Sequence, residues 1–122
     1  MKERIYEVLN KVGVPCHLKG RRYLETAIEI VLESGSIPMM KALYPSVAQR
    51  HSTDASGVEK SIGYAIDRCF CAGVDDSMVE VFGNIVNRKE NKLSASEFIY
   101  GLRSYLEAEA LRKSSQENNN GK

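Results

Sequence analysis

The sequence lacks any run of 18 or more apolar residues, the length at which a helix becomes a candidate for crossing a membrane. No contact with a membrane is therefore expected. The opening residues, Met-Lys-Glu-Arg, lead into charged sequence and not into the apolar core of a secretion signal, which predicts a cytoplasmic protein. Cysteine is scarce and its count of 3 is odd, so a disulfide framework is not expected.

Catalytic signatures are also missing. The chain has no glycine-rich phosphate loop, no nucleophile elbow and no metal-binding helix motif, so we expect neither an enzyme nor a small-molecule substrate. The available Cys and His residues do not form the Cys-x-x-Cys pairs of structural zinc sites. We therefore expect no metal and no cofactor at the candidate ligands Cys16, His17, His51, Cys69 and Cys71.

What the chain does contain is ordinary for one folded domain. It has 122 residues, of which 43% are hydrophobic and 27% charged. The 17 Lys and Arg nearly balance the 16 Asp and Glu, leaving a net charge of +1. Disorder of the whole chain needs fewer apolar residues and more net charge, so it is excluded.

Apolar residues recur every three and four positions between Gly and Pro residues, which predicts an all-α fold: a compact bundle of six to seven helices containing a helix-turn-helix. Pro45 is expected to end a short third helix that starts near Ile37 and to begin a fourth, and residues 84–93 to form a polar loop. A capping box, Ser94 with Glu97, predicts the start of the last helix. We expect a domain over residues 1–113 and a disordered tail over 114–122.

Residues 45–72 have the layout of a helix-turn-helix, in which a short helix supports a longer one whose outer face enters the DNA major groove. The helical period divides the segment into two faces. The inner face is predicted to contain Val47, Ala48, Val58, Ile62 and Ile66. The outer face is predicted to contain Ser56, Gly57, Glu59, Lys60, Gly63, Tyr64 and Asp67.

The outer face carries groups that DNA recognition uses. Lys60 can donate to guanine and Glu59 can accept from the cytosine amino group, while Tyr64 can reach a phosphate or a thymine methyl group. The backbone amides from Asp54 to Ser56 stand at a helix N-terminus, where a phosphate can bind. The pattern alone is equally compatible with two packed helices and a solvated face, because residues 36–72 carry four basic and three acidic residues.

Several stretches resemble the C-terminal DNA-binding effector domain of the master sporulation response regulator family, stage 0 sporulation protein A. In family order they are Gly13 to Gly20, Tyr23-Leu24 with Ala27-Ile28, Leu43 to Ala48, Ala55 to Ile62 with Ala65-Ile66, and Ser96 to Ile99, and the resemblance covers about residues 5 to 112. It implies a compact all-helical domain that binds short promoter elements, often as a head-to-tail pair on adjacent sites.

The chain departs from the family where DNA would be read. The family's recognition helix reads Ser-Arg-Val-Glu-Arg-Ala-Ile-Arg-His, and three of its arginines are replaced here by Gly57, Lys60 and Gly63, whereas Glu59 is retained. Lys60 keeps a charge but not the bidentate fork of arginine. The resemblance also implies that a lysine of the loop Arg88 to Lys92 approaches DNA. The expected DNA-binding residues are Thr53, Asp54, Ser56, Glu59, Lys60, Tyr64, Lys89 and Lys92. The basic residues Lys19, Arg21 and Arg22 are compatible either with a DNA or partner contact or with a solvated helix start.

Two functions therefore stand as hypotheses. The first is a sequence-specific transcription regulator of the sporulation-initiation effector type that lacks a receiver domain and binds double-stranded promoter DNA, as a homodimer or as a tandem pair. The second is a degenerate effector domain that acts as a protein-interaction module and pairs with a full-length regulator. Gly57, Gly63 and the low net charge favour the second, whereas Glu59 and Lys60 favour the first.

Overall fold

Helices account for every regular element in the computed structural model, which describes residues 2–34, 40–71, 73–87 and 93–120. The all-α prediction is confirmed. In chain order the elements are α1 (Lys2–Val12), α2 (Lys19–Glu33), α3 (Met40–Arg50), α4 (Ala55–Phe70), α5 (Asp76–Phe82), the 3-10 helix η1 (Gly83–Asn87) and α6 (Ala95–Asn120).

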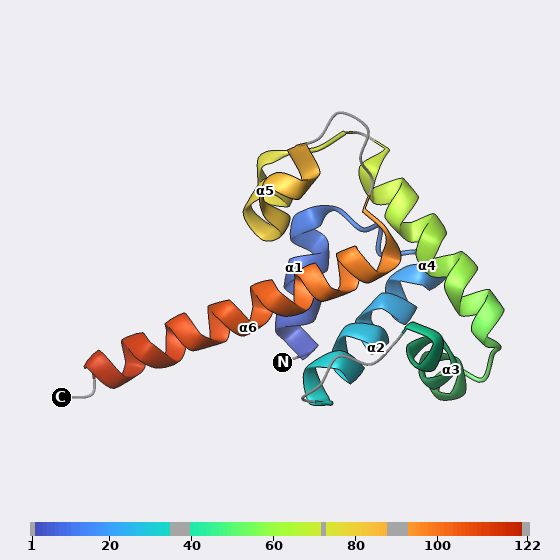
Figure 1. Cartoon of the computed structure of the whole chain (residues 1–122), viewed down its shortest axis with the longest axis horizontal. Helices are drawn as coiled ribbons and strands as arrows, with labels where there is room; N and C mark the ends of the chain where they lie inside the picture. The colour runs from blue at the N-terminus through green and yellow to red at the C-terminus, as the bar shows by residue number, and fades with distance from the viewer. Residues whose placement is uncertain (1, 35–39, 72, 88–92, 121–122) are drawn as a thin grey trace.

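Helix α2 is the central element. It packs against α1, α3, α4 and α6, and Figure 1 shows it between α6 and the α3–α4 pair. Leu24, Ala27, Ile28 and Val31 on α2 are completely shielded from solvent. Helix α5 packs against α1 and α6, on the side of α6 away from α3, whereas α1 crosses α6 in this view (Figure 1). No described helix is long and apolar enough to cross a membrane.

The contact between α2 and α4 depends on the absence of a side chain at Gly20. A Cβ atom built on Gly20 would lie 2.0 Å from the backbone oxygen of Ser61 and 2.8 Å from the Cβ of Ala65. These atoms are helix backbone and a methyl group, which cannot rotate away. Glycine is therefore required for the two helices to approach this closely.

Arg21, the next residue, holds the segment between α1 and α2. Its side chain is only 1% exposed, and its Nη1 donates to the Val14 carbonyl at 2.8 Å while its Nη2 donates to the Tyr6 carbonyl at 3.2 Å. Its Nε pairs with Glu25 at 2.8 Å, and its guanidinium lies 4.9 Å from the Tyr6 ring centroid. Arg21 is thus a buried structural cation and not a solvated or DNA-facing one.

Pro45 does not separate two helices, contrary to the prediction. Helix α3 runs without interruption from Met40 to Arg50 and contains Pro45. A proline in this position removes one backbone hydrogen bond. The Ser46 hydroxyl donates to the Ala42 carbonyl at 3.0 Å, and burial of Leu43 and Val47 on either side of the proline holds both halves in one helix. Ile37, predicted to start a separate helix, lies outside the described residues.

The C-terminal half agrees in part with the sequence analysis. Helix α5 spans Asp76–Phe82 and ends at Gly83, which has φ +75°. The first part of the predicted polar loop instead forms η1, because Val86 enters the core with 1% exposure. The capping box is confirmed: the Ser94 amide donates to Glu97 Oε1 at 2.9 Å, and the Glu97 amide donates to Ser94 Oγ at 3.2 Å.

Helix α6 continues to Asn120, whereas a disordered tail was predicted from Ser114. Its last fully packed side chain is Leu106, and Leu111 is 71% exposed. Extending a helix that already exists adds one hydrogen bond for each residue fixed and needs no new nucleation step. The helix therefore continues beyond its last packed side chain. Figure 1 shows this end of α6 projecting away from the other helices.

Two glycine substitutions test the α2–α4 contact. Gly20→Ala should lower the free energy of unfolding by about 1–3 kcal/mol or more, because the new methyl group overlaps the backbone of α4. Gly63→Ala is the matched control: apart from its chain neighbours and the α4 backbone, nothing lies within 4 Å of its added Cβ, and alanine favours a helix interior. It should raise the free energy of unfolding by up to about 1 kcal/mol. Urea unfolding measures both, and equal effects of the two changes would contradict the close contact.

Candidate nucleic-acid interface

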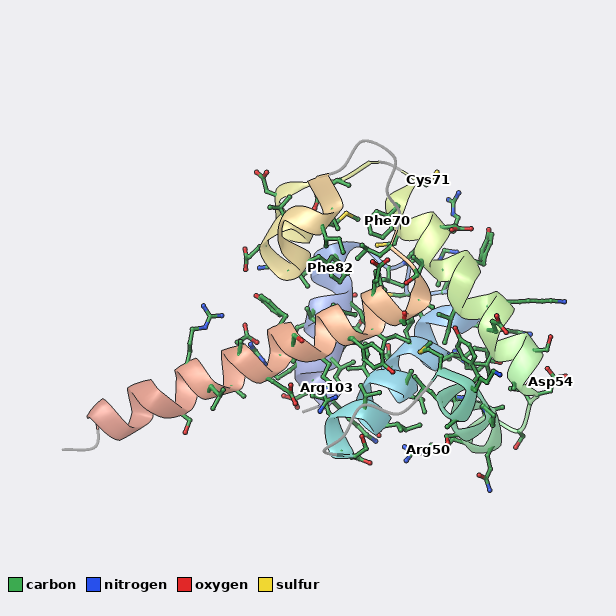
Figure 2. All side chains as sticks on the ribbon, in the orientation of Figure 1. Arg50, Asp54, Phe70, Cys71, Phe82 and Arg103 are labelled. Atoms are coloured by element: carbon green, nitrogen blue, oxygen red, sulfur yellow. The ribbon has the colours of Figure 1, made fainter. Side chains whose placement is uncertain are left out.

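The start of α4 is held by its N-cap residue. Asp54 has extended backbone angles (φ −108°, ψ 160°), and its Oδ1 accepts a hydrogen bond from the Gly57 amide at 2.6 Å. Figure 2 shows Asp54 at the end of α4 next to the turn from α3, with Cys71 at the opposite end of the helix. The Asp54 carboxylate, predicted to be part of a DNA-binding set, therefore has a structural role at this terminus.

The four-residue turn before α4 is fastened to α2. His51 Nε2 lies 2.7 Å from the Thr26 hydroxyl, and the His51 ring meets the Tyr23 ring edge-on at a centroid distance of 5.0 Å. The Thr53 amide donates to the Ala48 carbonyl at 3.0 Å. Arg50, labelled in Figure 2, forms ion pairs from α3 to two glutamates of α2, Glu29 and Glu33. These contacts set the angle at which α4 leaves the turn.

The predicted division of this segment into two faces is confirmed. All five side chains of the predicted inner face are buried: Val47, Ala48, Val58, Ile62 and Ile66. On the predicted outer face Gly57 and Gly63 are half-buried, and the exposed residues are Ser56, Glu59, Lys60, Tyr64 and Asp67. The arrangement of α3, the turn and α4 is consistent with a helix-turn-helix.

Among the predicted site residues, six lie together on the turn and α4. Thr53 and Asp54 are exposed at the turn, and the exposed members Ser56, Glu59, Lys60 and Tyr64 follow along α4. Lys89 and Lys92 lie outside the described residues. Their predicted approach to DNA therefore stays a prediction.

Among the residues that the structure describes, Glu59 and Lys60 on the α4 face form no ion pair, and Glu59 affects a neighbouring tyrosine. Burial raises the pKa of Tyr44 on α3, and the negative charge of Glu59 raises it further. Glu59 thus acts electrostatically on the supporting helix. Within the described ranges no salt bridge is formed by Lys60 or Glu59, so both charges are available to a partner.

The fold brings Lys19, at the start of α2, next to the exposed face of α4. With Lys60 and Tyr64 it lines a shallow hollow between the start of α2 and the outer face of α4. The sequence pattern placed Lys19 in one basic run with Arg21 and Arg22, but the three side chains have different environments. Arg21 is buried and Arg22 lines a separate hollow beside His51. The only sequence signal that distinguishes Lys19 is its position before Gly20, the residue at the helix contact.

The Cys and His residues are not brought together. Cys69 is buried and its thiol donates to the Val12 carbonyl at 3.1 Å, whereas Cys16 and Cys71 are exposed. In the part of the chain that the structure covers, no group of three or more potential metal ligands is found. His17 is exposed, and the loop that contains it is held by the buried Arg21 side chain, which donates to the Val14 carbonyl.

A comparison with protein-family models matches residues 5–106 to the family described as sporulation initiation factor Spo0A, C terminal. The match covers more than four fifths of the 122 residues. The chain belongs to this family. The Spo0A C-terminal domain is a DNA-binding effector domain of transcription regulation in sporulation, and it is not catalytic. The resemblance seen in the sequence is thereby confirmed.

The three thiols should differ in reactivity. Burial raises the pKa of the Cys69 thiol to about 12, and the negative charge of Asp75 adds to this. Because the folded-state pKa lies above the ordinary thiol value of 9.0, Cys69 stays protonated at neutral pH and favours the folded state until the pH rises through that range.

Iodoacetamide at pH 8 followed by mass spectrometry should therefore modify Cys16 and Cys71 in the native protein and Cys69 only after urea is added. Modification of Cys69 at the same rate as Cys71 under native conditions would contradict its burial.

Proposed function

We propose that this chain is a sequence-specific DNA-binding transcription regulator of the sporulation-initiation effector type, acting in the cytoplasm on double-stranded promoter DNA. The observation that carries the proposal is the outer face of α4. Its polar side chains are exposed side by side, while the opposite face of the same helix is buried in the core. A helix held in this way can enter the major groove without losing its packing.

Lys60 and Glu59 are the residues proposed to read bases. Lys60 donates to guanine, and Glu59 accepts from the amino group of cytosine. An acidic side chain near DNA is repelled by phosphates, so Glu59 is useful on this face only if it meets a specific donor. The Thr53 side chain and the backbone amides from Asp54 to Ser56, at the start of α4, approach the sugar-phosphate backbone. Lys89 and Lys92 contact it from their loop.

Family members bind promoter DNA. We extend the proposal to two copies bound on adjacent sites, because the recognition surface of one domain is small. One α4 face carries a single lysine, Lys60, and a second copy doubles the number of phosphate and base contacts.

One observation favours the second candidate function, a protein-interaction module that pairs with a full-length regulator. The family's arginines are replaced at Gly57 and Gly63, and no atom outside the α4 backbone and the chain neighbours lies within 4 Å of a Cβ built on Gly63. Positions 57 and 63 of the α4 face therefore offer no side chain to a phosphate. If DNA binding proves absent, this function takes its place.

Alanine substitutions at Lys60 and Glu59 test base reading. Lys60→Ala should weaken binding to a selected duplex by about 1–3 kcal/mol and relax its preference over a scrambled duplex. Glu59→Ala should reduce discrimination at one base position while non-specific affinity stays equal or increases, because a negative charge is removed. Fluorescence anisotropy across a salt series measures both.

An equal loss for both duplexes with Lys60→Ala would make Lys60 a phosphate contact and not a base reader. A wild-type protein that binds neither duplex at low salt would overturn the DNA-binding proposal.

Restoring the family's arginine at position 63 tests directly whether the α4 face meets DNA. Gly63→Arg should tighten binding to every duplex and increase the slope of log affinity against log salt by about one, since one more cation reaches the phosphates. The control Gly63→Ala adds the same Cβ and the same helix preference but no charge. If Gly63→Arg binds DNA no more tightly than Gly63→Ala, the α4 face does not meet DNA.

A further inference from the structure

A hollow lies beside the recognition face, at the point where two helices cross. The N-terminal part of α2 forms one wall and the outer face of α4 forms the other. We call it the Lys19 hollow, and its lining residues are Leu18, Lys19, Gly20, Lys60, Ser61 and Tyr64.

The charged groups of this hollow have one sign. Lys19 comes from α2 and Lys60 from α4, both are exposed, and no carboxylate belongs to the lining. Neither lysine has a salt-bridge partner in the ranges that the structure describes. Two unneutralised ammonium groups that face one concave surface attract an anion.

The walls of the Lys19 hollow are held at a fixed separation. Gly20 lies directly against the Ser61 backbone, and both residues line the hollow. The backbone at Lys19 therefore cannot move relative to α4 unless the helix crossing itself opens. Lys19 is anchored to the element that carries Lys60, although the two residues are far apart in the sequence.

We propose that the Lys19 hollow receives one phosphate of the DNA backbone, with Lys19 as the contacting cation. The proposal rests on the proposed function, since the same duplex must lie against α4. When Lys60 reads a base in the groove, the adjacent strand passes the rim of the groove where the hollow opens. Lys19 then fixes the register of α4 on the duplex and contributes no sequence preference of its own.

The test is the variant Lys19→Ala, measured by fluorescence anisotropy on a selected and a scrambled duplex across salt. Affinity should fall about two- to fivefold at low salt, equally for both duplexes, as expected for the loss of one exposed ion pair. The slope of log affinity against log salt should decrease in magnitude by about one. Lys19→Arg keeps the charge and should retain the wild-type slope.

Lys113→Ala is the matched control, because it removes the same charge from an exposed position on the part of α6 that projects away from α4 (Figure 1). It should leave the slope unchanged. If Lys19→Ala behaves like Lys113→Ala while the wild-type protein still prefers the selected duplex, the Lys19 contact is wrong and the proposed function stands. If Lys19→Ala changes the preference between duplexes, Lys19 meets a base and the phosphate assignment is wrong.

A second experiment distinguishes a phosphate of DNA from a free phosphate ion. In an NMR titration the Lys19 and Gly20 amide signals should shift with duplex DNA and not with inorganic phosphate at the same phosphate concentration. Equal shifts with inorganic phosphate would mean a free-anion site and would overturn the assignment to DNA. A wild-type protein that binds no duplex removes both this proposal and the proposed function.

Discussion

The backbone contact between Gly20 and Ser61 is the constraint on which the arrangement of this domain depends. Helix α2 packs against four other helices, and α4 is set against it at a distance that only glycine permits. The position of α4 in turn determines what its outer face presents. The buried stripe of α4 and the support of α3 complete the same arrangement, so core packing and the proposed DNA surface share one structural origin.

Arg21 has a related role one residue further along α2. A buried guanidinium is unfavourable unless its donors are satisfied, and here Val14, Tyr6 and Glu25 supply the acceptors. The charge is thereby used to fasten the segment between α1 and α2. Neighbouring lysine and arginine residues in one basic run thus serve different purposes: Arg21 is structural, and Lys19 is left facing outward beside α4.

The proposed recognition surface is firmly anchored to the rest of the domain but carries few charges. The turn is fastened to α2 through His51 and Thr26, and Asp54 caps α4. On this scaffold Lys60 is the cation near the start of the α4 face, with Glu59 beside it. Affinity for a polyanion rises with the number of cations that meet phosphates. In the proposed function, neighbouring elements and a second copy supply phosphate contacts beyond those of α4.

Features that depend on residues within about four positions of one another could be predicted from the sequence: the helical period, the capping box of Ser94 and Glu97, and the buried side of α4 with Ile62 and Ile66. Features that depend on contacts between distant segments were established only by the folded chain. Pro45 lies inside one helix because side chains on both sides of it are buried in the core. Gly20 and Lys19 acquire their significance from Ser61 and Lys60, which are distant in sequence, and no local pattern encodes such a contact. The burial of Arg21 likewise follows from carbonyl groups on other segments that only the folded chain brings to it.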